Sequence, residues 1–169
     1  MCAKELTVIN PWDESVSVTL PMITNEEADR VVARARAAFE GWRWSSPAER
    51  RALCEGFVRE FEALKEQTAA DITRQTGKPL SQSLGEVNGT LDRARHMIAI
   101  AEETLAEEYL PEKPCFVRYI RHEPLGVVLD IAAWNYPLLI AVNVVVPAVL
   151  AGNAVVIKHS SKKIGRAHV

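Results

Sequence analysis

A chain of 169 residues with a formal net charge of −2 is long enough for one domain with a core, and no excess of basic charge draws it to nucleic acid or to an anionic membrane. Hydrophobic residues make up 48% and charged residues 25% of the sequence, as in ordinary globular proteins. The three cysteines (Cys2, Cys54 and Cys115) form no CxxC pattern, which argues against a zinc site and against a disulfide framework. We therefore predict free thiols and no metal.

No segment has the character of a signal peptide or a membrane span. Met1 to Glu5 lacks an apolar core. The longest apolar stretch, residues 138–152, is interrupted by Asn143 and Pro147 and is shorter than the roughly 20 residues that a span needs. The sequence predicts a cytoplasmic protein with neither a membrane nor a nucleic-acid partner.

The first elements combine a short strand region with a helix. Val16, Val18 and Leu20 alternate with polar residues, which is typical of a strand with one wet face. Thr24 and Glu27 have the spacing of a capping box, so we expect a helix to begin there and to end near Gly41.

Two further stretches of helix are predicted before residue 106. One begins at Ser46-Pro47 and continues to Gly77, and the other covers about residues 81–105. We expect core packing and no chemistry from their apolar stripes, which are Leu53, Phe57, Phe61 and Leu64 on the first, and Val87, Leu91, Ala94, Ile98 and Ala101 on the second.

Residues 107–123 change character. Pro111 and Pro114 break helices, whereas Phe116, Val117 and Tyr119 favour strands. The pattern predicts an extended arm or hairpin, and an unpaired strand edge of this kind can recruit another subunit.

Residues 124–158 have the spacing of a strand–helix–strand unit. Two apolar runs, 125–132 and 154–158, favour parallel strands buried on both faces. The apolar stretch 138–150 between them favours a helix, which Pro147 should kink or split, and Gly152 is the expected left-handed stop.

Ligands of open α/β sheets bind beyond the carboxyl ends of the strands. Asn135 follows the first strand and Lys158 ends the second, so both are expected at that edge. An asparagine amide can donate a hydrogen bond to a developing oxyanion, and a lysine can donate to ribose or phosphate oxygens. The turn at 132–137 lacks GxGxxG, which excludes the usual glycine-rich pyrophosphate loop. Spacing alone leaves open both a nucleotide-binding fragment and a coincidental α/β domain.

An ordered set of motifs resembles the aldehyde dehydrogenase superfamily: EPLGVV at 123–128, WNYPL at 134–138, Pro147-Ala148, AGNAVV at 151–156 and Lys158. Weaker similarity at Asn10-Pro11, 35–42, 49–51 and 77–79 extends the resemblance to roughly residues 7–161. The resemblance implies an N-terminal fragment (residues 1–163) of a truncated α/β, partial Rossmann-like cofactor-binding domain, with N-terminal helices and an extended β arm.

The resemblance also implies roles for individual positions. Asn135 matches the catalytic asparagine of the oxyanion hole for the thiohemiacetal, and Lys158 matches the lysine that binds the adenosine ribose. The arm matches a segment that many members use to form homo-oligomers. In the family, one backbone stretch touches the nicotinamide half of the cofactor. The residues that match it here are Ile131, Ala132, Ala133 and Trp134.

Two positions depart from the family pattern. Ala133 stands where a proline is usual. Ser161 stands where many members that prefer NAD have a glutamate, which accepts from both ribose hydroxyls. A serine leaves room for a 2′-phosphate and removes a repelling charge, so the cofactor implied is NAD or NADP.

The implied reaction is the oxidation of an aldehyde to a carboxylic acid through a cysteine thiohemiacetal. The family's nucleophilic cysteine and general-base glutamate lie downstream of the matched segment, and Cys54 and Cys115 lack the nucleophile's context. We therefore expect the fragment alone to be inactive, and residues 164–169, which resemble a translated sequencing adapter, to be a non-native tail. A non-catalytic binding or assembly module is the alternative.

Overall fold

The computed structural model describes residues 5–160 of the chain. Its elements follow in the order β1 (Glu5–Ile9), β2 (Val16–Pro21), α1 (Asn25–Trp42), α2 (Pro47–Ala63), α3 (Lys65–Thr76), α4 (Leu80–Thr104), β3 (Glu108–Tyr109), β4 (Tyr119–Ile120), β5 (Val127–Ile131), α5 (Pro137–Leu150) and β6 (Ala154–Lys158). The α/β class, the N-terminal helices and the extended β arm that the sequence predicts are all present.

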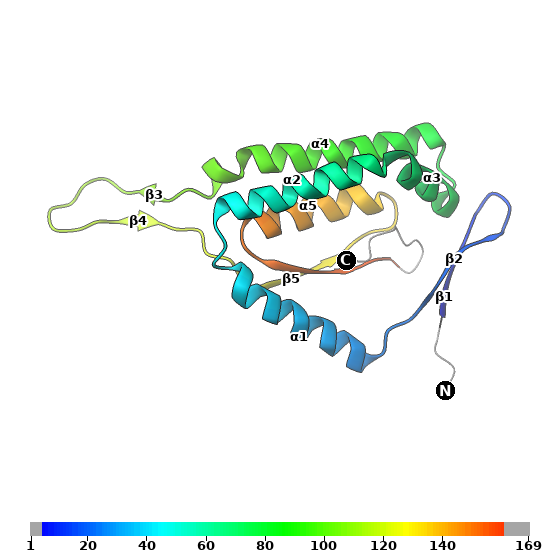
Figure 1. Ribbon diagram of the computed structural model, residues 1–169, viewed down its shortest axis with the longest axis horizontal. Coiled ribbons are helices and arrows are strands. Elements are labelled where there is room, and N and C mark those ends of the chain that lie inside the picture. The colour runs from blue at the N-terminus through cyan, green and yellow to red at the C-terminus, as the bar shows by residue number, and fades with distance from the viewer. Residues whose placement is uncertain (1–4, 161–169) are drawn as a thin grey trace.

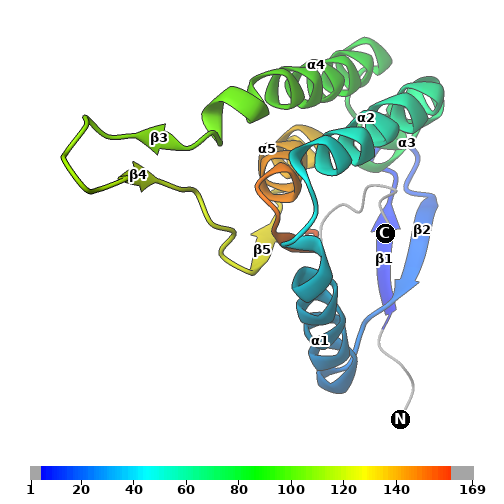
Figure 2. The ribbon, with the colours of Figure 1, turned by 60° about the vertical axis from the view of Figure 1, so that its left-hand side comes forward.

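The strand–helix–strand unit forms the centre of the fold (Figure 1). Strands β5 and β6 pair in parallel, with α5 as the crossover between them. Helices α2 and α4 pack against α5 on the side away from the strands, whereas α1 lies against β6 and β5 (Figures 1 and 2). The predicted βαβ unit is thereby confirmed.

The hydrophobic core lies between α2, α3, α4 and α5. On α4 the predicted stripe is correct: Val87, Leu91, Ala94 and Ile98 are buried and Ala101 packs at its rim. On α5 the buried face recurs every four residues at Leu138, Val142, Val146 and Leu150. Fully burying a side chain of this size stabilises a fold by about 1.5–3 kcal/mol. The pair of helices α4 and α5 therefore dominates the packing.

Local signals set the helix ends largely as predicted. Thr24 and Ser46 both form complete capping boxes, with Glu27 and Glu49 respectively. Gly77 ends α3 in the left-handed conformation, at φ 71°. Helix α1 ends at Trp42, one residue after Gly41, so its predicted end near Gly41 is confirmed, although Gly41 itself lies within the helix.

The predicted buried stripe of α2 is largely wrong. Leu53, Phe57 and Leu64 are exposed by 55%, 42% and 53%, whereas the buried residues are Cys54 and Val58. Only Phe61 of the predicted set packs against the core. The helix carries two overlapping apolar stripes, and α4 covers the one that runs through Cys54, Val58 and Phe61 at i, i+4 and i+7.

Strand β5 is not buried on both faces, contrary to the prediction. Leu129 and Ile131 are exposed by 60% and 68%, whereas Asp130 between them is 5% exposed. Within residues 5–160 the sheet has two strands, and α1 lies mainly against β6, so one face of β5 is left open. Successive residues of a strand point to opposite faces, which explains the alternation.

Helix α5 runs unbroken from Pro137 to Leu150, so Pro147 does not split it. A proline inside a helix removes one backbone hydrogen bond, and dense packing of the helix can offset that loss. Among residues 5–160, the combination of length and apolar character that a bilayer span requires is found in none of the helices.

The predicted hairpin is present and projects away from the body (Figure 1). Glu108 pairs with Ile120, and Tyr109 pairs with Tyr119. Tyr109, Phe116 and Val117 are exposed by 69%, 61% and 80%. Whether this hairpin joins subunits stays a prediction.

Candidate functional site

The carboxyl ends of β5 and β6 lie side by side and form the edge where the sequence predicts a ligand. Ile131 is the register partner of Lys158. The ladder continues for one more residue, because the backbone N–H of Ala132 donates to the carbonyl oxygen of Lys158 at 3.1 Å. The loop that carries Asn135 leaves directly from this point, so Asn135 and Lys158 belong to the same edge of the sheet.

The turn from Ala132 to Tyr136 leaves polar and aromatic groups open to solvent. Ala132 is 3% exposed and anchors the turn, whereas Ala133 and Asn135 are exposed. Trp134 is 48% exposed. Tyr136 has φ −140° and ψ 70°, a non-helical conformation that the following Pro137 favours. An exposed amide at this position can donate to an oxygen of a bound molecule.

Lys158 presents an exposed ammonium group at the end of β6. Its Nζ donates to the carbonyl oxygen of His159 at 3.1 Å. Within residues 5–160 this is the one hydrogen bond that the ammonium makes. An ammonium has three donors, so this geometry suits hydrogen bonds to hydroxyl or phosphate oxygens. Ser161 and residues 164–169 lie outside the described residues.

Asp130 lies beneath the same edge, and the sequence prediction missed it. Burial raises the pKa of its carboxyl group, and the nearby His159 works in the opposite direction. An acidic residue inside the apolar run VVLDI was the signal that could have revealed it. Within residues 5–160 no cluster of three or more His, Cys, Asp or Glu side chains is placed to hold a metal ion.

Glu86 on α4 is a second residue that the prediction missed. Its side chain is fully buried, with one carboxylate oxygen 3.1 Å from the backbone nitrogen of Leu138 and the other 2.7 Å from Nζ of Lys78. Glu86, Thr90 and Ala94 recur every four residues, so Glu86 lies on the buried face of α4. Acidic residues are rarely buried unless paired, so this position was a recognisable signal.

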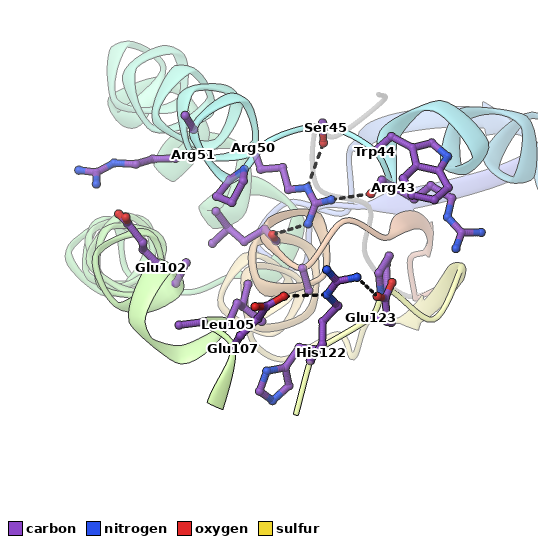
Figure 3. A pocket seen from close by; sticks show the side chains of 18 of the residues that line it. Arg43, Trp44, Ser45, Arg50, Arg51, Glu102, Leu105, Glu107, His122 and Glu123 are labelled. Atoms are coloured by element: carbon purple, nitrogen blue, oxygen red, sulfur yellow. Dashed lines mark hydrogen bonds and ion pairs between the residues drawn. The ribbon is translucent and has the colours of Figure 1, made fainter. Parts of the chain in front are cut away.

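A cavity of about 790 Å³, shown in Figure 3, is lined by residues that do not belong to this edge. It is bounded by the turn between α1 and α2, the end of α4 and the root of the hairpin, and it reaches Leu150 and Ala151 at the far end of α5. The residues that line it include neither the turn of residues 132–136 nor Lys158, and among them Arg121 pairs with Glu107 at 3.0 Å and with Glu123 at 3.3 Å. The cavity is therefore separate from the candidate site.

Neither cysteine in the described residues is set up as a nucleophile. Cys54 is 4% exposed in the core, and burial raises the pKa of its thiol to about 11. A thiol with such a pKa is protonated at neutral pH and therefore inert. Cys115 is exposed on the hairpin, away from the β5 and β6 edge.

Comparison with known proteins agrees with this architecture. The model of the aldehyde dehydrogenase family matches residues 2–167. N-succinylglutamate 5-semialdehyde dehydrogenase 1 of Caulobacter vibrioides is 33% identical over 162 residues, which cover 96% of this chain and 34% of the relative. Succinate-semialdehyde dehydrogenase (NADP+) 1 of Mycobacterium tuberculosis is 34% identical over 160 residues, covering 92% of this chain and 35% of the relative.

Solved structures show the same relationship. A betaine aldehyde dehydrogenase of Staphylococcus aureus in complex with NAD+ superposes with a TM-score of 0.88 at 29% identity, over 94% of this chain and 32% of the other. The chain belongs to the aldehyde dehydrogenase family. It spans about a third of the length of the curated relatives that it matches.

Proposed function

We propose that this chain is the N-terminal part of the cofactor-binding domain of an enzyme that oxidises an aldehyde to a carboxylic acid with NAD+ or NADP+. The observation that carries the proposal is the shared edge at which Asn135 and Lys158 follow two adjacent parallel strands. All the relatives named above are dehydrogenases of aldehydes, which supports an enzyme over the alternative of a non-catalytic assembly module.

Each residue at the edge has a distinct role in this proposal. The amide of Asn135 donates a hydrogen bond to the oxygen of a cysteine thiohemiacetal, where negative charge develops. The ammonium of Lys158 donates to the adenosine ribose. This role fits an exposed group that donates one hydrogen bond to the described part of the protein. The nicotinamide half of the cofactor contacts the stretch made of Ile131, Ala132, Ala133 and Trp134. The cofactor, when bound, accepts the hydride of the substrate.

We propose that the nucleophile and the general base of this reaction lie outside this chain, and we therefore expect the 169-residue protein to give no turnover by itself. The protein encoded by the complete open reading frame should reduce NAD+ or NADP+ when it is given an aldehyde. A cysteine and a glutamate outside these 169 residues would be its reacting groups. The test is absorbance of the reduced cofactor over a panel of aldehydes for both proteins. Turnover by the 169-residue chain that Asn135→Ala abolishes would contradict the expected inactivity.

Use of NADP+ beside NAD+ is proposed on the basis of Ser161, which lies outside the described residues. A serine offers no negative charge to repel a 2′-phosphate. The complete enzyme should therefore use NADP+ at least as efficiently as NAD+, and Ser161→Glu should lower kcat/KM for NADP+ while sparing NAD+. Steady-state kinetics with both cofactors decide this. A hundredfold preference of the unmodified enzyme for NAD+ would count against it.

We further propose that the hairpin, residues 107–123, joins subunits of a homo-oligomer. The proposal is supported by its projection from the body and by its exposed apolar side chains. Strand edges that lack a partner readily pair with other chains.

A further inference from the structure

We propose that Lys78 and Glu86 are positioning residues that hold the turn of residues 132–136 and the start of α5, and thereby aim the Asn135 amide. The inference rests on the proposed function of Asn135 and adds residues that lie outside the edge itself. It is carried by one connected set of contacts that joins α4, the turn before it and the first residues of α5.

Glu86 holds the start of α5 from a different helix. The first N–H groups of a helix have no partner within that helix, and α5 has no side-chain cap of its own at Tyr136. The carboxylate of Glu86 accepts from the N–H of Leu138 at 3.1 Å. A negative charge is also favoured at the positive end of a helix. The position of the first turn of α5 is therefore fixed by a residue on α4.

Lys78 connects this carboxylate to the aromatic ring beside Asn135. Its Nζ lies 2.7 Å from the second carboxylate oxygen of Glu86 and 3.8 Å from the centroid of the Tyr136 ring. The side chain is 18% exposed, so the ammonium is largely shielded from water. A cation over an aromatic face at this distance is attracted to it, and the attraction increases as water is excluded.

Asn135 is consequently bracketed by two fixed points. On one side the N–H of Ala132 is bonded to the carbonyl of Lys158, and on the other side the ring of Tyr136 lies against Lys78. Stability alone is a weak reason for this arrangement, because a buried ion pair must first lose its hydration. The proposed role of Asn135 explains the arrangement better, because the ion pair keeps the neighbouring Tyr136 in one place.

The test compares Lys78→Met, Lys78→Arg and Arg95→Met in the complete enzyme. Arg95 is the matched control, because it pairs with Glu62 at the surface of α4. We expect Lys78→Met to lower kcat by about 10- to 100-fold with KM for the cofactor unchanged, as for a misplaced reacting group. Lys78→Arg should recover most of the rate, since a guanidinium also binds a carboxylate and an aromatic face. Arg95→Met should leave kcat unaltered.

A double variant separates positioning from general destabilisation. If Lys78 acts through Asn135, Lys78→Met combined with Asn135→Ala should be no slower than Asn135→Ala alone. Losses that multiply would overturn the inference. Hydrogen exchange gives a readout besides activity: the peptide over residues 132–138 should exchange faster in Lys78→Met than in Arg95→Met, and equal exchange would overturn the inference as well.

Two outcomes distinguish this inference from the proposed function. If Asn135→Ala keeps the unmodified rate, both fail. If Asn135→Ala is slow and Lys78→Met is normal, only the positioning role fails. Should Lys78→Met not fold, Tyr136→Leu takes its place, because that ring is 47% exposed and its removal leaves the ion pair intact. The same loss of kcat is expected, and an unchanged kcat would refute the role.

Discussion

Replacement of Asn135 by alanine is expected to lower kcat of the complete enzyme by about 100- to 1000-fold, the usual loss when one oxyanion donor is removed. Asn135 is exposed in the turn after β5, so its truncation removes no core contact. The amide is proposed to act on charge that develops during the reaction, and KM for the cofactor should therefore change little. Steady-state kinetics with saturating cofactor measure both constants.

Asn143→Ala is the matched control for this experiment. Asn143 is an exposed asparagine on α5 whose side chain accepts from Arg93 at 3.1 Å, away from the β5 and β6 edge. Its loss should leave kcat as it was. Equal rates for Asn135→Ala and Asn143→Ala would remove the catalytic role from Asn135.

Gly152→Ala should lower the free energy of unfolding by about 3 kcal/mol, from two physical causes. Gly152 has φ 87°, and a left-handed conformation costs a residue with a Cβ about 1–2 kcal/mol. The new methyl group would also lie 2.6 Å from atoms of the Arg50 guanidinium, and overpacking typically costs about 1–3 kcal/mol.

Arg50 cannot easily move aside. Its guanidinium donates to Oγ of Ser45 at 2.9 Å, to the carbonyl of Arg43 at 2.9 Å and to the carbonyl of Leu150 at 3.4 Å. It thus joins the turn between α1 and α2 to the end of α5 (Figure 3). A methyl group at Gly152 must break at least part of this arrangement.

Urea denaturation of the 169-residue chain measures the effect, with Gly85→Ala as the control. Gly85 lies inside α4, and a Cβ there would meet nothing within 4 Å. Alanine is the better helix former by about 1 kcal/mol, so Gly85→Ala should raise the free energy of unfolding. A Gly152→Ala variant as stable as the parent would show that neither cause operates.

The features that the sequence predicted well depend on near neighbours in the chain. The capping boxes at Thr24 and Ser46 need residues three positions apart, and the stop at Gly77 needs one glycine. The alternation of two apolar runs around a helix was enough to predict that β5 and β6 are parallel, and hence that Asn135 and Lys158 share an edge.

The features that the sequence missed depend on distant partners. Helix α2 has two apolar stripes, and only the packing of α4 decides that Cys54 is buried while Leu53 is exposed. The spacing of Glu86 can place it on the buried face of α4, but its partners are a lysine eight positions earlier and a backbone amide 52 positions later, which the sequence does not identify. Local periodicity therefore identifies neither the covered stripe of α2 nor the partners of Glu86.

The open face of β5 has a practical consequence. Leu129 and Ile131 lie uncovered on a strand that, within residues 5–160, has a neighbour on one side alone. Exposed apolar side chains beside unpaired backbone N–H and C=O groups form a surface that pairs with strands of other molecules. Preparations of the chain therefore carry a risk of precipitation that originates in this sheet, and a lysine in place of Leu129 is the substitution that most directly counters it.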